Sequence, residues 1–158
     1  MKCAKSVKVT FRYTADTLDN GIAWSKSDFL FLNGTNVFLF PEGQPLEYSA
    51  TVAIHTEADW HVTTGMASSA GARTFAASNY HDLVDMPFFI GRYDLDSARV
   101  VNRWVRLATY PVGSISGQLR LAAWDQLKKV IPVEASVFGE TPWENYTVMQ
   151  IVDSTYGG

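Results

Sequence analysis

The sequence lacks the residues that common catalytic motifs and covalent cross-links require. It contains one cysteine, Cys3, which excludes an internal disulfide. The three histidines, His55, His61 and His81, form no His-Glu-x-x-His pair, and the chain has neither a Gly-x-Ser-x-Gly elbow nor a phosphate-binding glycine loop. His55 and His61 could meet across a turn, but two histidines without a third ligand make a poor metal site. The sequence therefore predicts no catalytic residue and no metal ligand within the chain.

Basic clusters and long apolar runs are missing as well. The net charge is -3 with both signs interspersed, so we expect neither nucleic acid nor an anionic membrane surface as a partner. The longest apolar run, Phe29 to Phe40, is interrupted by Asn33-Gly34-Thr35-Asn36 and is too short to span a bilayer. The first residues hold lysines and no apolar signal core. The sequence therefore leaves two localisations open: the cytoplasm, or the periplasm if the true N-terminus is missing from this sequence.

The composition that is present is that of a globular protein. The 158 residues are 47% hydrophobic, 13% aromatic and 18% charged. This mix is typical of a folded domain and not of a disordered or collagen-like chain. The length allows one good core, or one small domain with part of another.

The first part of the chain has the two-residue period of β-strands. Apolar Val7, Val9, Phe11 and Tyr13 alternate with polar residues, which predicts a half-buried strand. Asn33-Gly34 lies between two apolar runs and indicates a hairpin, although the four-residue gap makes a longer loop equally possible. Further alternation at residues 48–54 and 60–64 extends the pattern. We expect antiparallel β-structure from residue 5 to about residue 91, arranged as a sandwich or a saddle-shaped sheet.

The second part changes to a strand, a helix and a strand. Residues 100–110 alternate like a strand, and from Ser116 to Phe138 the apolar period becomes about 3.6 residues. Pro132 must kink or split this helix, because proline removes a ladder donor and clashes with the preceding turn. Residues 146–152 then form a buried strand. The fold class is therefore predicted as α+β, with a β-rich domain at residues 1–93 and the opening of a second domain at residues 94–158.

The helical period also predicts which side chains are buried. Six apolar residues fall on one side of the helix: Leu119, Ala123, Leu127, Val130, Ile131 and Phe138. We therefore expect Leu127 and Phe138 to lie in the core beneath it. Truncation of a buried Phe138 to alanine would then cost about 3–5 kcal/mol. Trp60 is expected to be buried in the sheet domain.

Two groups of residues are candidates for a site. Four aspartates, Asp82, Asp85, Asp94 and Asp96, could do acid–base work if they were buried together, but aspartates favour turns and caps, and a solvated cluster fits them better. Gly157 and Gly158 follow the last strand, where they permit close approach of a substrate backbone along a sheet edge. An ordinary turn is the alternative for these glycines.

Several segments, in order along nearly the whole chain, resemble the glycyl aminopeptidase family of thermolysin-like zinc metallopeptidases. They are the runs at residues 31–39 (Phe-Leu-Asn-Gly-Thr-Asn-Val-Phe-Leu), 60–65 (Trp-His-Val-Thr-Thr-Gly), 75–87 (Phe-Ala-Ala-Ser-Asn-Tyr-His-Asp-Leu-Val-Asp-Met-Pro), 127–129 (Leu-Lys-Lys) and 137–146 (Val-Phe-Gly-Glu-Thr-Pro-Trp-Glu-Asn-Tyr). The ending Tyr156-Gly157-Gly158 is similar to the first half of the family's Gly-Gly-x-Glu-His motif.

This resemblance implies part of an N-terminal β domain followed by the start of a catalytic domain. It implies that Gly157 and Gly158 bind the peptide substrate, while the zinc ligands, the general base and the rest of the glycine motif would lie beyond residue 158. The chain would then be a non-catalytic scaffold fragment of a zinc aminopeptidase that removes N-terminal glycine or alanine. The alternative is a stand-alone β-sandwich module that binds a protein or peptide without enzymatic activity.

Overall fold

The computed structural model describes residues 6–19 and 21–155 of the chain. Within these ranges the strands are β1 (Trp24–Lys26), β2 (Phe29–Leu32), β3 (Ala50–Ala53), β4 (His61–Thr64), β5 (Ala67–Ser68), β6 (Thr74–Ala77), β7 (Phe88–Gly91), β8 (Asp94–Val100), β9 (Arg103–Tyr110) and β10 (Asn145–Ile151). The helical elements are the 3₁₀ turn η1 (Gly34–Asn36) and the α-helices α1 (Tyr80–Asp85) and α2 (Gly117–Phe138).

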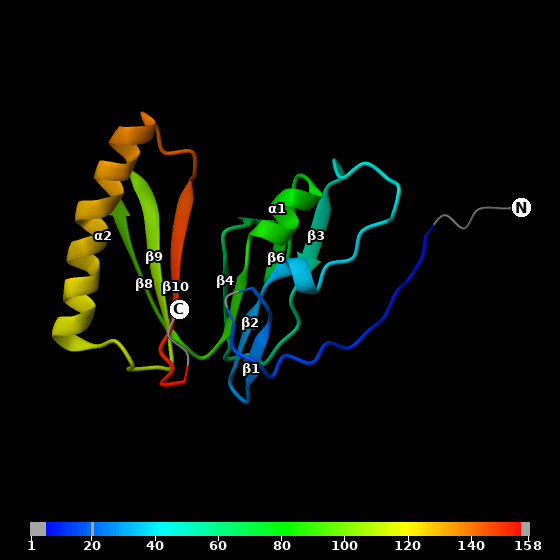
Figure 1. Ribbon diagram of the computed structural model, residues 1–158, viewed down its shortest axis with the longest axis horizontal. Coiled ribbons are helices and arrows are strands. Elements are labelled where there is room, and N and C mark those ends of the chain that lie inside the picture. Colours follow the sequence, from blue (N-terminus) through cyan, green and yellow to red (C-terminus); the bar gives the residue numbers. More distant parts are fainter. Residues whose placement is uncertain (1–5, 20, 156–158) are drawn as a thin grey trace, which may run out of the picture.

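The strands form three small sheets. The first has the order β1-β2-β7-β4, the second β3-β6-β5 and the third β10-β9-β8. All strand pairs among the described residues are antiparallel except β9 with β10, which are parallel and are connected through α2. Figure 1 shows the first two sheets and α1 on one side, and the third sheet with α2 on the other. The predicted α+β class is confirmed, whereas the sandwich arrangement of the first part is not, and the division at residue 93 stays a prediction.

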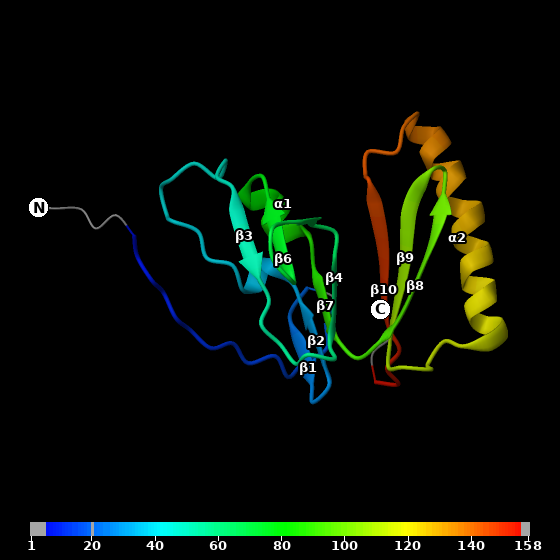
Figure 2. The same cartoon turned by 180° about the vertical axis from the view of Figure 1, so that it is seen from behind.

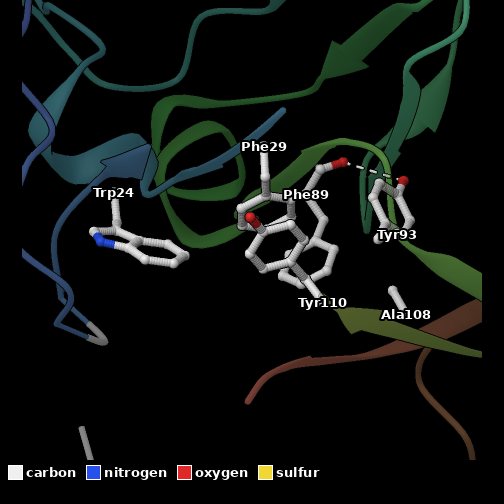
Figure 3. Close-up of a cluster of buried hydrophobic side chains, with 6 residues drawn as sticks. All are labelled: Trp24, Phe29, Phe89, Tyr93, Ala108 and Tyr110. Atoms are coloured by element: carbon white, nitrogen blue, oxygen red, sulfur yellow. Dashed lines mark hydrogen bonds between the residues drawn. The ribbon is translucent and has the colours of Figure 1, made fainter. Parts of the chain in front are cut away.

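A cluster of aromatic side chains, the aromatic core, packs between the first sheet and the third sheet. Phe29 of β2 stacks on Tyr110 of β9 with ring centroids 4.0 Å apart, and Phe89 of β7 meets Phe29 edge-on at 4.5 Å (Figure 3). Phe29 and Phe89 are fully buried, and Met149 and Ile151 of β10 pack against the same cluster. Burial of large aromatic rings contributes most of the energy of such a contact. The last strand is therefore held against the first part of the chain.

A second apolar cluster fills the space under α1. Leu83 of α1 packs with Phe88 of β7 and Phe75 of β6, and Trp60 contributes a partly buried ring. Trp60 thus lies in the sheet region as predicted, although it is not fully buried.

The hairpin predicted at Asn33-Gly34 does not form. The chain turns into η1 instead, with the Asn33 side chain accepting a hydrogen bond from the Thr35 N–H at 3.1 Å. Gly34 is required there by close packing, because a Cβ atom at this position would lie 2.8 Å from Cα of Val84. Glycine is therefore needed at this position because the backbone packs closely against α1, and not because a tight hairpin turn requires it.

The strand predicted at Val7–Tyr13 is also wrong. These residues have no strand partner within the described part of the chain, and the exposed fractions run from 83% at Val7 to 43% at Tyr13. The alternation makes the segment suited to a sheet, but a strand needs a neighbouring strand to complete its hydrogen bonds.

The strand predicted across residues 100–110 is interrupted by a turn. Val101 and Asn102 both have positive φ, 46° and 64°, and connect β8 to β9 as a two-residue hairpin. Such turns normally contain Asn-Gly or Asp-Gly. This turn has no glycine, and Val101 continues the apolar alternation. The sequence pattern therefore gives no signal for the turn.

The helix α2 is continuous from Gly117 to Phe138, with Pro132 inside it, so the predicted split is wrong, while the kink at Pro132 stays a prediction. Gly139 ends the helix in the left-handed conformation with φ of 76°, as its position suggested. No helix within the described residues combines the length and apolar character needed to cross a membrane.

The buried face of α2 agrees only in part with the predicted one, which included Leu127 and Ile131. Arg120, Trp124, Leu127 and Ile131 face the third sheet, and Ile131 packs with Val105 of β9. Leu127 is partly buried as expected, but Phe138 is 78% exposed, and Leu119 and Val130 are exposed as well. The helix carries two apolar stripes, and only one of them faces the sheet.

A polar network fixes the start of α2 on the sheet. The Arg120 guanidinium donates to a carboxylate oxygen of Asp96 on β8 and to the Thr109 hydroxyl at 2.8 Å, and the Trp124 indole N–H donates to the same Asp96 oxygen at 3.2 Å. The guanidinium holds the pKa of Asp96 below its usual range.

Candidate functional site

The candidate site lies along β10 and the segment that leads into it. β10 pairs with β9 along its whole length, and within the described residues no strand occupies its other edge. After the strand, the Val152 N–H still donates to the Tyr110 carbonyl at 2.8 Å, and the Asp153 side chain accepts from the Thr155 N–H at 2.7 Å in a tight turn. Gly157 and Gly158, the predicted substrate-binding residues, lie outside the described residues. β10 nevertheless directs the chain toward them.

A groove runs between the start of β10 and the first part of the chain. It has a volume of about 590 Å³, which is in the range of ligand sites. One wall contains the segment after β4, β6 and α1, and the other contains residues 142–145. Its lining includes Ala76, Ser78, Asp82, Met86, Trp143 and Asn145. In Figures 1 and 2 the sheet of β10 faces the first part of the chain across this region.

The carboxylates of the groove are engaged in local hydrogen bonds. Asp82 accepts from the Ser78 hydroxyl at 2.5 Å and from the Asn79 amide at 2.8 Å, and its own N–H is capped by Asn79. Glu144 pairs with Arg103 at 2.8 Å. Asp82 is thus held in the cap of α1 and Glu144 in an ion pair, so the arrangement is suited to binding and not to proton transfer.

The residues present do not fit a zinc ion. Within residues 6–19 and 21–155, no three histidine, cysteine, aspartate or glutamate side chains gather as a ligand set. Of the three histidines, His61 begins β4 with its ring 5.8 Å from that of Tyr93, and His81 lies in α1. His55 borders a separate shallow pocket beside Trp60.

The four aspartates considered from sequence have separate local roles. Asp82 belongs to the cap of α1, and Asp94 accepts from the Gly113 N–H at 2.7 Å. Asp96 holds Arg120 and Trp124, while Asp85 is exposed in α1. They do not form a paired-carboxylate site, as the turn-and-cap interpretation suggested.

Sequence reasoning missed the groove itself. Its lining residues come from four segments that are far apart in the chain and carry no shared motif. One local signal was available, because Asn79 followed three residues later by Asp82 marks the N-terminus of α1, which forms part of the wall.

The chain is similar to a protein of known structure and to a known protein family. It resembles a crystal structure of an aminopeptidase N family protein from Idiomarina loihiensis, with a TM-score of 0.80 and 26% sequence identity. The match covers 91% of this chain and 25% of that protein, so the chain spans about a quarter of the length of the protein it matches. None of the curated proteins compared with it matches. The model of the peptidase M61 N-terminal domain matches residues 1–92, more than half of the 158 residues, and the chain therefore belongs to that peptidase family.

Proposed function

We propose that the chain is the substrate-side scaffold of a zinc-dependent aminopeptidase that removes N-terminal residues of the glycine or alanine type. The observation that carries this proposal is β10. It is a strand with one unoccupied edge among the described residues, it borders a groove, and it leads toward Gly157-Gly158. A peptide backbone can pair with such an edge, and glycines allow it to approach closely.

In this proposal residues 94–158 open a thermolysin-like catalytic domain, and residues 1–93 form a β domain against which it packs. The aromatic core around Phe29 and Tyr110 supports a fixed relation between the two parts. The proposal places the zinc ligands outside the described residues, which do not form a ligand set for the metal. The metal would supply polarisation of the scissile carbonyl, while this chain would bind and orient the peptide.

The test begins with the coding sequence past Gly158. Continuation into x-Glu-His and a later His-Glu-x-x-His, together with stoichiometric zinc and aminopeptidase activity in the encoded protein, is the expected result. A stop codon at this point would instead select the alternative, a stand-alone module that binds a protein or peptide without catalysis.

A further inference from the structure

Arg106 of β9 is a half-buried arginine whose charge has no anionic partner in the described part of the chain. The other half-buried arginines are fully engaged: Arg73 donates to four main-chain carbonyls, and Arg103 and Arg120 pair with carboxylates. Arg106 makes one long hydrogen bond, from Nη1 to the Asn145 side-chain oxygen at 3.4 Å. A guanidinium has five N–H donors, and removing it from water without an anion is costly.

Arg106 lines a cavity between the two parts of the chain. The cavity has a volume of about 300 Å³, at the lower end of the range for ligand sites. Its wall combines residues of β4, β5, β8 and β9 with Asn145. In both Figure 1 and Figure 2, β4 and β10 are the strands of the two parts that face each other here. The cavity shares Met66, Ala67 and Asn145 with the groove beside β10, so the two adjoin each other.

Hydroxyl groups complete the polar wall. Thr63 and Thr64 are 5% and 2% exposed, and Ser68 lies beside them. The Tyr93 hydroxyl lies 2.7 Å from the Thr63 oxygen and 3.2 Å from the Phe89 carbonyl, which can only accept a hydrogen bond, so Tyr93 and Thr63 share one hydroxyl–hydroxyl contact in this wall. The Thr64 oxygen accepts from the Met66 N–H at 3.4 Å, and its own hydroxyl hydrogen is able to donate.

From this geometry we propose that the Arg106 cavity binds a carboxylate group. A planar guanidinium matches the two oxygens of a carboxylate, and neutral hydroxyl and amide groups can satisfy the remaining lone pairs. One unpaired positive charge balances a monoanion. A phosphate dianion would bring a second negative charge that no other cation of the cavity wall balances. The carboxylate belongs either to the C-terminal end of a short peptide in the groove or to an acidic side chain. The proposal concerns binding and does not depend on peptide cleavage.

The experiment is a titration of the 158-residue chain followed by NMR at the Arg106 Nε–H and the Asn145 side-chain amide. The probes are N-acetylalanine, N-acetylaspartic acid amide, N-acetylalanine amide and inorganic phosphate, each up to about 100 mM, since a single charge-assisted contact gives millimolar affinity. We expect saturable shifts with the two carboxylates and none with N-acetylalanine amide. Tighter binding of N-acetylalanine identifies a peptide terminus, and tighter binding of the aspartic acid amide identifies an acidic side chain.

Variants separate the site from general charge effects. Arg106→Met should weaken the carboxylate affinity about tenfold or more, because it removes a hydrogen bond to a charged group, and Arg106→Lys should give an intermediate loss. Arg99→Met is the control, since Arg99 stacks on Trp104 at an exposed position on the neighbouring strand. If neither carboxylate shifts the two reporter groups, if phosphate binds more tightly than both, or if Arg106→Lys and Arg106→Met bind as well as wild type, the proposal is wrong. The wild-type titration decides the first two outcomes even if a variant does not fold.

Discussion

Val101 has a backbone conformation that a β-branched side chain disfavours. Its φ of 46° lies in the left-handed region, which β-branched residues avoid at a cost of about 1–2 kcal/mol. Asparagine is favoured at this position of a two-residue hairpin. We expect Val101→Asn to raise the free energy of unfolding by about 1 kcal/mol in a urea titration. Val112→Asn, at another exposed valine whose φ is not positive, should change it by less than about 0.5 kcal/mol. Equal effects of the two substitutions would show that the turn is not strained.

Tyr93 couples stability to alkaline pH. Burial raises the pKa of its hydroxyl to about 12, from an ordinary value of 10.0. The folded state therefore keeps the proton that the unfolded state releases, so this contribution is complete below pH 10 and is lost as the pH rises toward 12. It amounts to about 3 kcal/mol for a shift of this size, since each pKa unit corresponds to about 1.4 kcal/mol.

The Tyr93→Phe variant tests this coupling. Its free energy of unfolding, measured between pH 9 and about 11.5, should fall less steeply with pH than that of the wild type. The variant also loses the hydrogen bond to Thr63, so its stability at neutral pH should be lower. Identical slopes would show that Tyr93 does not titrate differently in the folded protein.

At the scale of elements, α2 tolerates a proline that disfavours it. Pro132 removes one ladder hydrogen bond inside a 22-residue helix, and proline is about 3 kcal/mol less favourable than alanine in a helix interior. Pro132→Ala should therefore stabilise the chain, by about 1–3 kcal/mol in a urea titration. Glu134→Ala, at an exposed position in the same turn, serves as control and should change stability by less than about 0.5 kcal/mol. A destabilised Pro132→Ala variant would contradict the continuous helix.

The exposure of Phe138 reverses the expectation drawn from helical periodicity. With a side chain that is 78% exposed, Phe138→Ala should cost less than about 1 kcal/mol. Ile131→Ala, from the buried face of the same helix, should cost about 2–5 kcal/mol. Thermal and denaturant unfolding of the two variants measure this difference. A larger loss of stability for Phe138→Ala than for Ile131→Ala would mean that Phe138 is buried, as the helical periodicity predicted.

The hydrophobic periodicity identified most helices and strands, but it could not show which strands pair with one another. The helix at 117–138 and the strand at 145–151 were predicted closely, because their patterns are long and end at clear signals such as Gly139. The strand at Val7–Tyr13 failed because alternation shows suitability for a sheet and not the presence of a neighbour. The turn at Val101-Asn102 was missed because its geometry is imposed by the pairing of β8 with β9 and not by local turn residues.

At the scale of the whole molecule, the position of the site follows from contacts between distant segments. The sequence indicated a strand leading to Gly157-Gly158, and β10 confirms that strand. The groove and the Arg106 cavity could not be predicted, because they depend on how the aromatic core around Phe29 and Tyr110 places one part of the chain against the other. The match to the peptidase M61 N-terminal domain covers residues 1–92, which supply one wall of the groove.

The peptidase proposal is tested most directly by Gly158→Val in the protein encoded by the complete coding sequence. In this proposal Gly158 lies at the docking edge, where a branched side chain would obstruct the substrate backbone without touching a metal ligand. The account predicts a loss of kcat/KM of about tenfold or more for a dipeptide with N-terminal glycine or alanine, with zinc content and thermal stability unchanged. Unchanged turnover in a variant that folds and binds zinc as the wild type does would contradict it.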